Sequence, residues 1–421
     1  MKTYKVRQRQ WRVLVVQNWT LWTRKKKSCI QIILPQVMLS FVSAPLGTNS
    51  WFRLCGTNKE IFKTKDRLYA MKGGEGASSY AQNSTFQRDA IEASKEFIRE
   101  AIAENFDSKW TKPTSPICIA DLGCSTGPNT FLAMQTMIEA INFQFQSEGL
   151  VAQMPEFQVF FNDQISNDFN TLFKNLPQSR KYFASGVPGS FRGRLFPRKT
   201  LHLVHSSSSL CWLSKVPKEI MDKGSSAWNK GRIFHKNAPK EVVDAYATQY
   251  KADLESFLHA RAQELANNGL MLLQIPIASD VILDSDVDPG KIFEVLGSCL
   301  LDMVRVGMVS EEKVDSFNVP LFYPPIKNVK EIVESNGIFR IERMRPFHVK
   351  NNVTFPTVQR LVLFYRAVLD EMIDQHFGGG IGDELFNRLA KKVKEFPNYM
   401  NPKKQKIDFI FVLLKRKPNL M

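Results

Sequence analysis

Two acidic residues of this sequence each mark the end of a short apolar run, where a ligand could bind. Asp121 follows the apolar run PICIA (residues 116–120) and begins the loop sequence DLGCSTG (residues 121–127). Asp163 is the last residue of the run EFQVFFND (residues 156–163), 40 residues after Gly123. Glycines let the backbone approach a ligand closely. An acid at the end of the second strand can accept two hydrogen bonds from ribose hydroxyls. These residues therefore predict a site for a ligand that contains ribose.

The glycine spacing narrows the choice of ligand. Gly123 and Gly127 are separated by three residues, unlike the GxGxxG pattern of dinucleotide sites, and no Lys-Ser/Thr pair of a phosphate-binding loop follows. A ligand with ribose but without phosphate fits better, so we expect S-adenosylmethionine rather than NAD or ATP. A tight strand–helix turn in another kind of α/β protein is the alternative that these residues leave open.

Alternating helices and strands must position these residues. Apolar periodicity predicts helices over 90–104, 130–145 and 241–266, and short apolar runs predict strands at 116–123, 156–163, 201–205, 269–275 and 409–414. This alternation is typical of an α/β protein with a doubly wound, mainly parallel sheet. Residues 214–240 and 278–352, the latter with an apolar helix over 292–308, interrupt it. We expect them to form a helical cap over the pocket.

The composition excludes several functions. The first 70 residues hold 14 Lys and Arg but only Glu60 and Asp66 as acids, so they carry +12 of the net charge of +16, and the other 351 residues carry only +4. A nearly neutral body argues against a nucleic-acid partner. The six cysteines show no paired spacing, and no CxxC or HExxH motif occurs, so neither a disulfide framework nor a structural zinc site is expected.

Residues 1–68 form a basic leader, and residues 69–421 are expected to form the functional domain. The leader combines a basic cluster at Arg24–Lys27 with an apolar stretch over 29–46 that Pro35 and Pro45 interrupt. That stretch is too short to span a membrane, so no membrane partner is expected. The leader is interpreted as a disordered extension, a mis-assigned start before Met71, or a targeting segment. We expect a cytoplasmic protein, with plastid targeting as the alternative.

Ordered motifs across residues 69–417 resemble the SABATH family of plant S-adenosylmethionine-dependent methyltransferases. They include MKGGEGASSYAQNS from Met71, ADLGCSTGPNT from Ala120, GVPGSF from Gly186, WLSKVP from Trp212 and DSFN from Asp315. The runs WNKGRI from Trp228 and FFND from Phe160 look most like members that methylate loganic acid and farnesoic acid. The resemblance implies a Rossmann-like class I methyltransferase sheet with a helical cap, and methylation of a carboxylate.

The resemblance also implies roles for particular residues. The positions where the family holds S-adenosylmethionine are Tyr80, Asp121, Cys124, Asn129, Asp163, Gln164, Ser190 and Phe191. Gln87 and Trp212 match the positions that hold the acceptor carboxylate through N–H groups. A magnesium position of some relatives matches Asn229, Asp315, Phe317 and Asn318, whose oxygens would suit a hard cation in a structural role. His205 is interpreted as a structural histidine. No catalytic base is expected, because a carboxylate is already ionised at neutral pH.

Four positions near the expected substrate site depart from the family pattern. Ser208 stands where a larger residue such as Tyr is common, Cys211 where His or Met is usual, and Leu321 and Phe322 replace a polar-aromatic pair. These changes predict a wider, more apolar pocket and hence a longer, largely apolar carboxylic acid as the partner. N-methylation of a xanthine-like heterocycle and a degenerate, non-catalytic protein are the alternatives. A homodimer is expected from the relatives alone.

Overall fold

The computed structural model describes residues 70–278, 290–350, 355–396 and 406–417. They belong to one compact unit that extends over Asp66–Met421. The basic leader predicted from the sequence lies outside the described residues.

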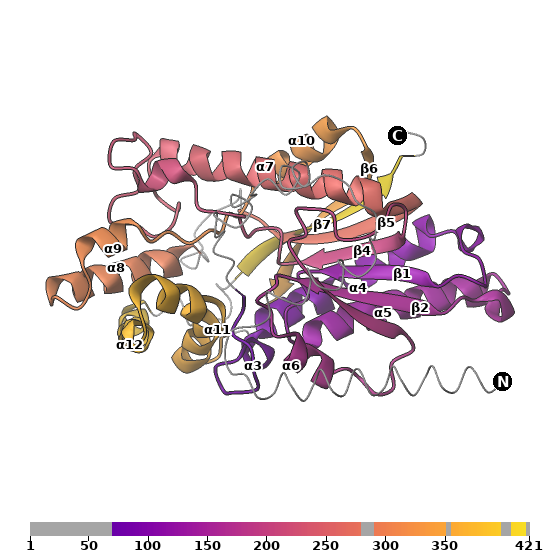
Figure 1. Cartoon of the computed structure of the whole chain (residues 1–421), viewed down its shortest axis with the longest axis horizontal. Helices are drawn as coiled ribbons and strands as arrows, with labels where there is room; N and C mark the ends of the chain where they lie inside the picture. Colours follow the sequence, from indigo (N-terminus) through magenta and orange to yellow (C-terminus); the bar gives the residue numbers. More distant parts are fainter. Residues whose placement is uncertain (1–69, 279–289, 351–354, 397–405, 418–421) are drawn as a thin grey trace, which may run out of the picture. The chain divides into compact units, whose positions relative to one another are not determined.

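A seven-stranded sheet with the strand order β3-β2-β1-β4-β5-β7-β6 forms the centre of this unit (Figure 1). The strands are β1 (Ile117–Leu122), β2 (Phe157–Asp163), β3 (Phe183–Pro188), β4 (Leu201–Ser207), β5 (Leu265–Pro276), β6 (Phe339–Lys350) and β7 (Lys406–Arg416). The strands from β3 to β5 pair in parallel, whereas β7 is antiparallel to both β5 and β6. The order reverses between β1 and β4, and ligands of open α/β sheets bind at that switch point, beyond the carboxyl ends of the strands.

Helices cover both faces of the sheet. They are α3 (Tyr80–Asn83), α4 (Thr85–Asn105), α5 (Pro128–Ser147), α6 (Phe169–Lys174), α7 (Lys240–Glu264), α8 (Lys291–Arg305), α9 (Glu311–Asp315), α10 (Ile326–Asn336), α11 (Val358–Phe377) and α12 (Ile381–Lys392), with short 3-10 turns η2 (Ser108–Trp110), η3 (Val151–Gln153), η4 (Lys218–Met221) and η5 (Val393–Glu395). Strand β1 shows the division: Ile117 and Ile119 pack in the core with α4 and α5, whereas Cys118 and Ala120 pack in the core with α7 and α10. Because successive strand residues face opposite sides, a strand buried on both faces reads as a continuous apolar run.

The predicted cap is helical, but its composition differs from the expectation. Helices α8, α9, α11 and α12 gather beyond one end of the sheet, where α12 packs against α8 and α11 (Figure 1). Residues 339–350 fall within the cap that the sequence predicts, but they form the edge strand β6 of the sheet instead. Residues 358–392, which were not placed there, supply α11 and α12. The α/β fold with a doubly wound, mainly parallel sheet that the sequence predicts is confirmed.

None of the helices in the described part of the chain has both the length and the apolar character required to cross a membrane.

Candidate active site

The loop after β1 forms one wall of a pocket. Gly123 has a φ of +86°, and a Cβ at this position would lie 2.1 Å from Ser209 Oγ, so the loop requires a glycine here. Helix α5 follows with Pro128 in its first turn, a position where the missing N–H costs nothing. Its next residue, Asn129, lines the pocket and donates from its amide to the carbonyl of Ser84, 3.0 Å away. The glycine loop thus places the N-terminus of α5 at the pocket.

Asp163, at the end of β2, is held in place by backbone N–H groups. Its Oδ2 accepts from Ser125 N at 2.7 Å, and its Oδ1 accepts from Gln164 N at 2.7 Å. Burial raises the pKa of this carboxyl to about 6, although the two N–H donors act in the opposite direction. Each oxygen keeps a further lone pair, so the group can accept two hydrogen bonds from a vicinal diol.

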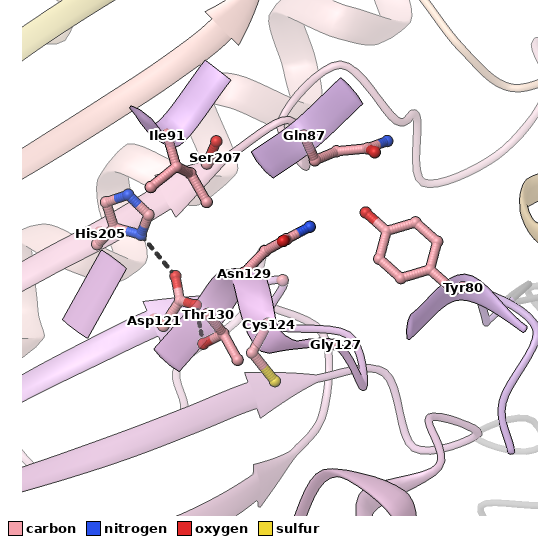
Figure 2. Close-up of a pocket in the computed structure, with 11 residues that line it drawn as sticks. Tyr80, Gln87, Ile91, Asp121, Cys124, Gly127, Asn129, Thr130, His205 and Ser207 are labelled. Atoms are coloured by element: carbon pink, nitrogen blue, oxygen red, sulfur yellow. Dashed lines mark hydrogen bonds and ion pairs between the residues drawn. The ribbon is translucent and has the colours of Figure 1, made fainter. Parts of the chain in front are cut away.

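Asp121 belongs to a buried chain of polar groups that reaches across three strands, β1, β4 and β5. His205 Nδ1 lies 2.7 Å from Asp121 Oδ1, and Thr130 Oγ1 donates to the other carboxylate oxygen (Figure 2). Gln274 Nε2 lies 3.3 Å from His205 Nε2. A neutral imidazole that donates from Nδ1 leaves Nε2 as the acceptor for this amide. His205 therefore has both ring nitrogens engaged, which supports its interpretation as a structural residue.

Side chains from three helices converge on the pocket. Figure 2 shows Tyr80 of α3, Gln87 of α4 and Asn129 of α5 extending into the same space. Burial raises the pKa of Tyr80, so its hydroxyl remains protonated and able to donate. Gln87 Oε1 is buried and has no hydrogen-bond partner among the described residues. A buried amide with an unpaired atom is costly, and a bound ligand would remove that cost. The full lining is Tyr80, Gln87, Ile91, Asp121, Gly123, Cys124, Gly127, Asn129, Thr130, His205 and Ser207.

The segment with Ser190 and Phe191 lies beside the glycine loop. The Phe191 ring comes within 3.7 Å of the position that a Cβ on Gly123 would occupy. The ring also packs edge-on against Phe257 of α7, with 5.9 Å between centroids. Phe191 is only partly buried, which leaves ring surface available to a ligand.

The residues predicted to hold the acceptor follow β4. Ser208 has a positive φ of 59°, uncommon for a residue with a side chain, and its buried hydroxyl has no partner among the described residues. Cys211 is buried, and burial raises its thiol pKa to about 12, so it acts as a small neutral group. Trp212 forms an isolated β-bridge with Leu321, and Phe322 N donates to Cys211 O at 2.8 Å. Ser208, Cys211, Trp212 and Phe322 therefore form one neighbourhood, whereas Gln87, also predicted to bind the acceptor, lines the pocket described above.

The structure brings the predicted site residues together in two groups. Tyr80, Gln87, Asp121, Cys124 and Asn129 line one pocket, and Asp163 and Gln164 adjoin it through Ser125. Ser208, Cys211, Trp212 and Phe322 form the second group and do not line that pocket; Ser207, which precedes the second group, does. Ser190 and Phe191 lie beside the glycine loop.

Among the predicted metal ligands, Asn229 and Asn318 are bonded to each other, and Asp315 is bonded to a neighbouring backbone N–H. Asn229 Nδ2 donates to Asn318 Oδ1 at 2.8 Å, and Gly231 N donates to Asp315 Oδ1 at 2.9 Å. Asn229 Oδ1 is buried without a hydrogen bond and is the one feature that points to a cation. Magnesium prefers a near-octahedral set of oxygens. In the described ranges, no group of three or more His, Cys, Asp or Glu side chains is arranged to hold a metal. Asn318 Oδ1 and Asp315 Oδ1 already accept hydrogen bonds, so the structure itself does not show a magnesium site at these residues.

Two arginines near the site, the partly buried Arg192 and the fully buried Arg261, were not found from the sequence. Arg192 donates to the carbonyl of Trp212, and Arg261 donates from Nη1 to the carbonyl of Phe191 at 2.7 Å. Neither belongs to a motif of recognisable chemistry, and their partners are distant in sequence. An arginine directly after the GSF run was the one available signal.

The sheet order, the glycine loop after β1 and the acid at the end of β2 define a class I S-adenosylmethionine-dependent methyltransferase. Residues 66–417 match the family described as SAM dependent carboxyl methyltransferase, and the chain belongs to this family. Loganic acid O-methyltransferase of Catharanthus roseus is 44% identical over 361 residues, which cover 85% of this chain and 96% of that protein. Farnesoic acid carboxyl-O-methyltransferase of Arabidopsis thaliana is 39% identical over 346 residues, with 82% and 98% covered. The solved structure of loganic acid methyltransferase with SAH has a TM-score of 0.77 and 44% identity, covering 83% of this chain and 99% of that one.

Proposed function

We propose that the acceptor of this carboxyl methyltransferase is a small, largely apolar carboxylic acid, which it converts to a methyl ester. The observation that carries the proposal is the lining of the pocket. Gln87 shares it with the residues proposed to hold S-adenosylmethionine, and none of the described residues that line it is a lysine or an arginine. A neutral amide can orient a carboxylate by hydrogen bonding and leave its negative charge available for attack. The apolar character is supported by Cys211 and Phe322, both buried beside Trp212.

The residues around the pocket fit S-adenosylmethionine, which supplies a methyl group already activated by its sulfonium. In our proposal Asp163 holds the ribose, Asn129 and Asp121 face the amino-acid end, and Phe191 lies against the adenine. Gln87 and the indole N–H of Trp212 orient the acceptor carboxylate. The remaining cofactor contacts fall to Tyr80, Cys124, Gln164 and Ser190. No residue needs to accept a proton, because the acid arrives ionised. The protein acts by alignment at about 3 Å and by exclusion of water.

The unpartnered hydroxyl of Ser208 refines the expected acceptor. A buried hydroxyl without a partner costs about 1–3 kcal/mol, so an acceptor that brings one oxygen near Ser208 would bind better than a pure hydrocarbon acid. We therefore expect an apolar acid with one further oxygen, such as a keto group, to be preferred.

The test is incubation of the full chain with methyl-labelled S-adenosylmethionine and a panel of acids. Benzoic, jasmonic, indole-acetic, farnesoic, gibberellic and loganic acids and xanthosine would be included. Base-labile label on an apolar acid is the expected result. Label confined to loganic acid would contradict the apolar acceptor, and label only on xanthosine would establish N-methylation. Cofactor binding without label on any compound would indicate a degenerate protein.

We propose that any magnesium would bind as a structural cation, with Asn229, Asp315, Phe317 and Asn318 as its ligands. Because these residues lie outside the pocket lining, EDTA should leave the methylation rate unchanged and lower the melting temperature only if a cation is bound. We also propose a homodimer that acts in the cytoplasm. Light scattering of the purified protein tests the dimer, and a fluorescent fusion tests the location.

A further inference from the structure

Helix α7 carries a row of buried charged residues on one face. Asp253, Arg261 and Glu264 are separated by eight and three residues, which correspond to about two turns and one turn of helix. Their exposed fractions are 9%, 0% and 0%. Charged residues are almost never so completely buried unless they are paired, so their partners indicate what this face of α7 holds.

Arg261 and Glu264 hold the segment that contains Phe191. Arg261 donates from Nη1 to Phe191 O at 2.7 Å and from Nη2 to Gly193 O at 2.8 Å. Glu264 Oε1 accepts from Leu195 N and from Phe196 N, and its Oε2 lies 2.7 Å from Arg261 Nε. The pair thus supplies hydrogen-bond partners for backbone N–H and C=O groups of the 191–196 segment and fixes this segment on α7.

Asp253 holds the segment that follows Trp212. Its Oδ2 accepts from Ser214 N at 2.6 Å, and its Oδ1 accepts from Ser214 Oγ at 2.7 Å. Gln249 Nε2, one turn earlier on the same helix, donates to Oδ1 at 3.0 Å. One helix therefore anchors both the proposed adenine segment and the proposed carboxylate segment.

Arg192 connects the two anchored segments. It follows Phe191 directly, and its guanidinium carbon lies 5.1 Å from the centroid of that ring. Its Nη2 donates to Trp212 O, and its Nε lies 3.5 Å from Asp253 Oδ2. The side chain is 14% exposed. Burial lowers its pKa, but an arginine stays protonated in proteins. One cation therefore touches the groups next to both proposed binding sites.

We propose that Arg192 is a positioning residue that couples cofactor binding to the acceptor site. The inference rests on the proposed function, because that places adenine at Phe191 and the acceptor carboxylate at Trp212. An adenine against Phe191 restrains the segment that bears Arg192. The restrained guanidinium then fixes the Trp212 carbonyl, and with it the backbone that orients the indole N–H. The planar fork of arginine can contact Trp212 and Asp253 together, which the single ammonium of lysine does less well.

Hydrogen–deuterium exchange of the full chain tests this coupling without an acceptor. The probes are the amides of Trp212, Leu213 and Ser214, which are bonded to Ser209 O, Pro320 O and Asp253. In the unsubstituted protein, saturating S-adenosylhomocysteine should slow their exchange by about fivefold, a typical coupling between two sites. In Arg192→Gln the slowing should vanish, and Arg192→Lys should restore part of it.

The matched control is Arg194→Gln. Arg194 lies two residues away in the same segment, is exposed, and bonds to Phe196 O rather than to Trp212. This variant should keep the full slowing. Equal slowing in Arg192→Gln and the unsubstituted protein, or none in the unsubstituted protein, would overturn the proposal. Should Arg192→Gln fail to fold, Asp253→Asn, which removes the charge opposite Arg192, must reduce the slowing instead.

A second measurement separates this inference from the proposed function. For an acid that the panel identifies, its Kd is measured with and without S-adenosylhomocysteine. The ratio should exceed about fivefold in the unsubstituted protein and fall towards one in Arg192→Gln. If no acid is methylated, the proposed function fails while the exchange experiment still decides whether Arg192 couples the two segments.

Discussion

The proposed role of Asp163 can be tested directly by a single substitution. Replacement of Asp163 by Asn removes the carboxylate that we assign to the ribose. Hydrogen bonds to a charged group contribute about 1.5–3 kcal/mol each, so the Kd for S-adenosylhomocysteine should rise by at least about tenfold. Calorimetric titration measures it, with Glu139→Gln on the exposed surface of α5 as the control. An unchanged Kd would remove Asp163 from the site.

The raised pKa of Asp163 gives a separate pH prediction. Because burial raises the pKa to about 6, the carboxyl is ionised above that pH and becomes neutral below it. A neutral carboxyl is the poorer acceptor for ribose hydroxyls. The Kd for S-adenosylhomocysteine should therefore rise as the pH falls below about 6, by at most about tenfold per pH unit. The Asp163→Asn variant should lose this dependence, and a Kd that is flat from pH 7 to 5 in the unsubstituted protein would contradict the assignment.

Gln87 offers a test of the acceptor carboxylate. Gln87→Glu nearly preserves the shape of the side chain but places a negative charge where the acid should bind. Methylation should fall by more than about 100-fold, because like charges in a buried site repel strongly, whereas cofactor binding should change little. Gln82→Glu, on the exposed side of α3, is the matched control. Radiolabel transfer measures the effect, and equal rates in both variants would exclude Gln87 from acceptor binding.

The β1–α5 connection can be tested as a structural element. Gly123→Ala adds both the strain of a positive φ and a clash with Ser209, whereas Gly149→Ala, at φ +70° with open space around it, adds only the strain. We expect Gly149→Ala to lower the free energy of unfolding by about 1–2 kcal/mol. Gly123→Ala should lower it further and abolish cofactor binding. Urea unfolding of both variants makes the comparison, and equal losses would mean that the loop relaxes around the methyl group.

The buried ion pair of α7 gives a prediction for the adenine segment. Arg261→Met leaves Glu264 buried without its partner, which typically destabilises a protein by about 3–5 kcal/mol. The carbonyls of Phe191 and Gly193 also lose their donor, so the affinity for S-adenosylhomocysteine should fall as well. Urea unfolding and calorimetry measure the two effects. A variant that loses stability but binds the cofactor normally would show that the pair serves the fold alone.

The elements differ in how well the sequence predicts them. Strands β1, β2, β4, β5 and β7 are apolar because both faces are covered, and helices α4, α5, α7 and α8 show clear periodicity, so these were predicted. Strand β3 is a partly exposed edge strand with an interior glycine, and the other edge strand, β6, carries several charges and Pro346. Neither pattern indicates a strand. The sheet context that makes them strands is supplied by partners distant in sequence.

The site residues, like the strands, could be predicted only where the local sequence indicates their surroundings. Asp121 and Asp163 could be predicted because each directly follows a recognisable strand core, and strand ends meet at one edge of the sheet. The contacts of Arg192 with Trp212 and of Asp253 with Ser214 join positions 20 and 39 residues apart. They depend on how two segments, 191–196 and 212–214, pack on α7, and local spacing does not encode that packing.

On the scale of the whole molecule, the positive charge is concentrated at one end of the sequence. The first 70 residues carry +12, and the rest of the chain is nearly neutral. Affinity for a polyanion should therefore depend almost wholly on this part of the chain. Removal of residues 1–65 should sharply lower the salt needed to elute the protein from heparin and leave the methylation rate unchanged. Retention that survives the removal would indicate a basic surface on the folded unit.

The position of β7 has a consequence for synthesis. This strand comes from residues 406–416, close to the end of the chain, yet it lies between β5 and β6. In the sheet, β6 pairs with β7, so β6 cannot join until residues 406–416 have been made. Chains grow from their N-terminus. A nascent protein therefore leaves one edge of β5 unpaired until residues 406–416 have been made, and a stop codon shortly before residue 406 removes two strands from the sheet rather than one.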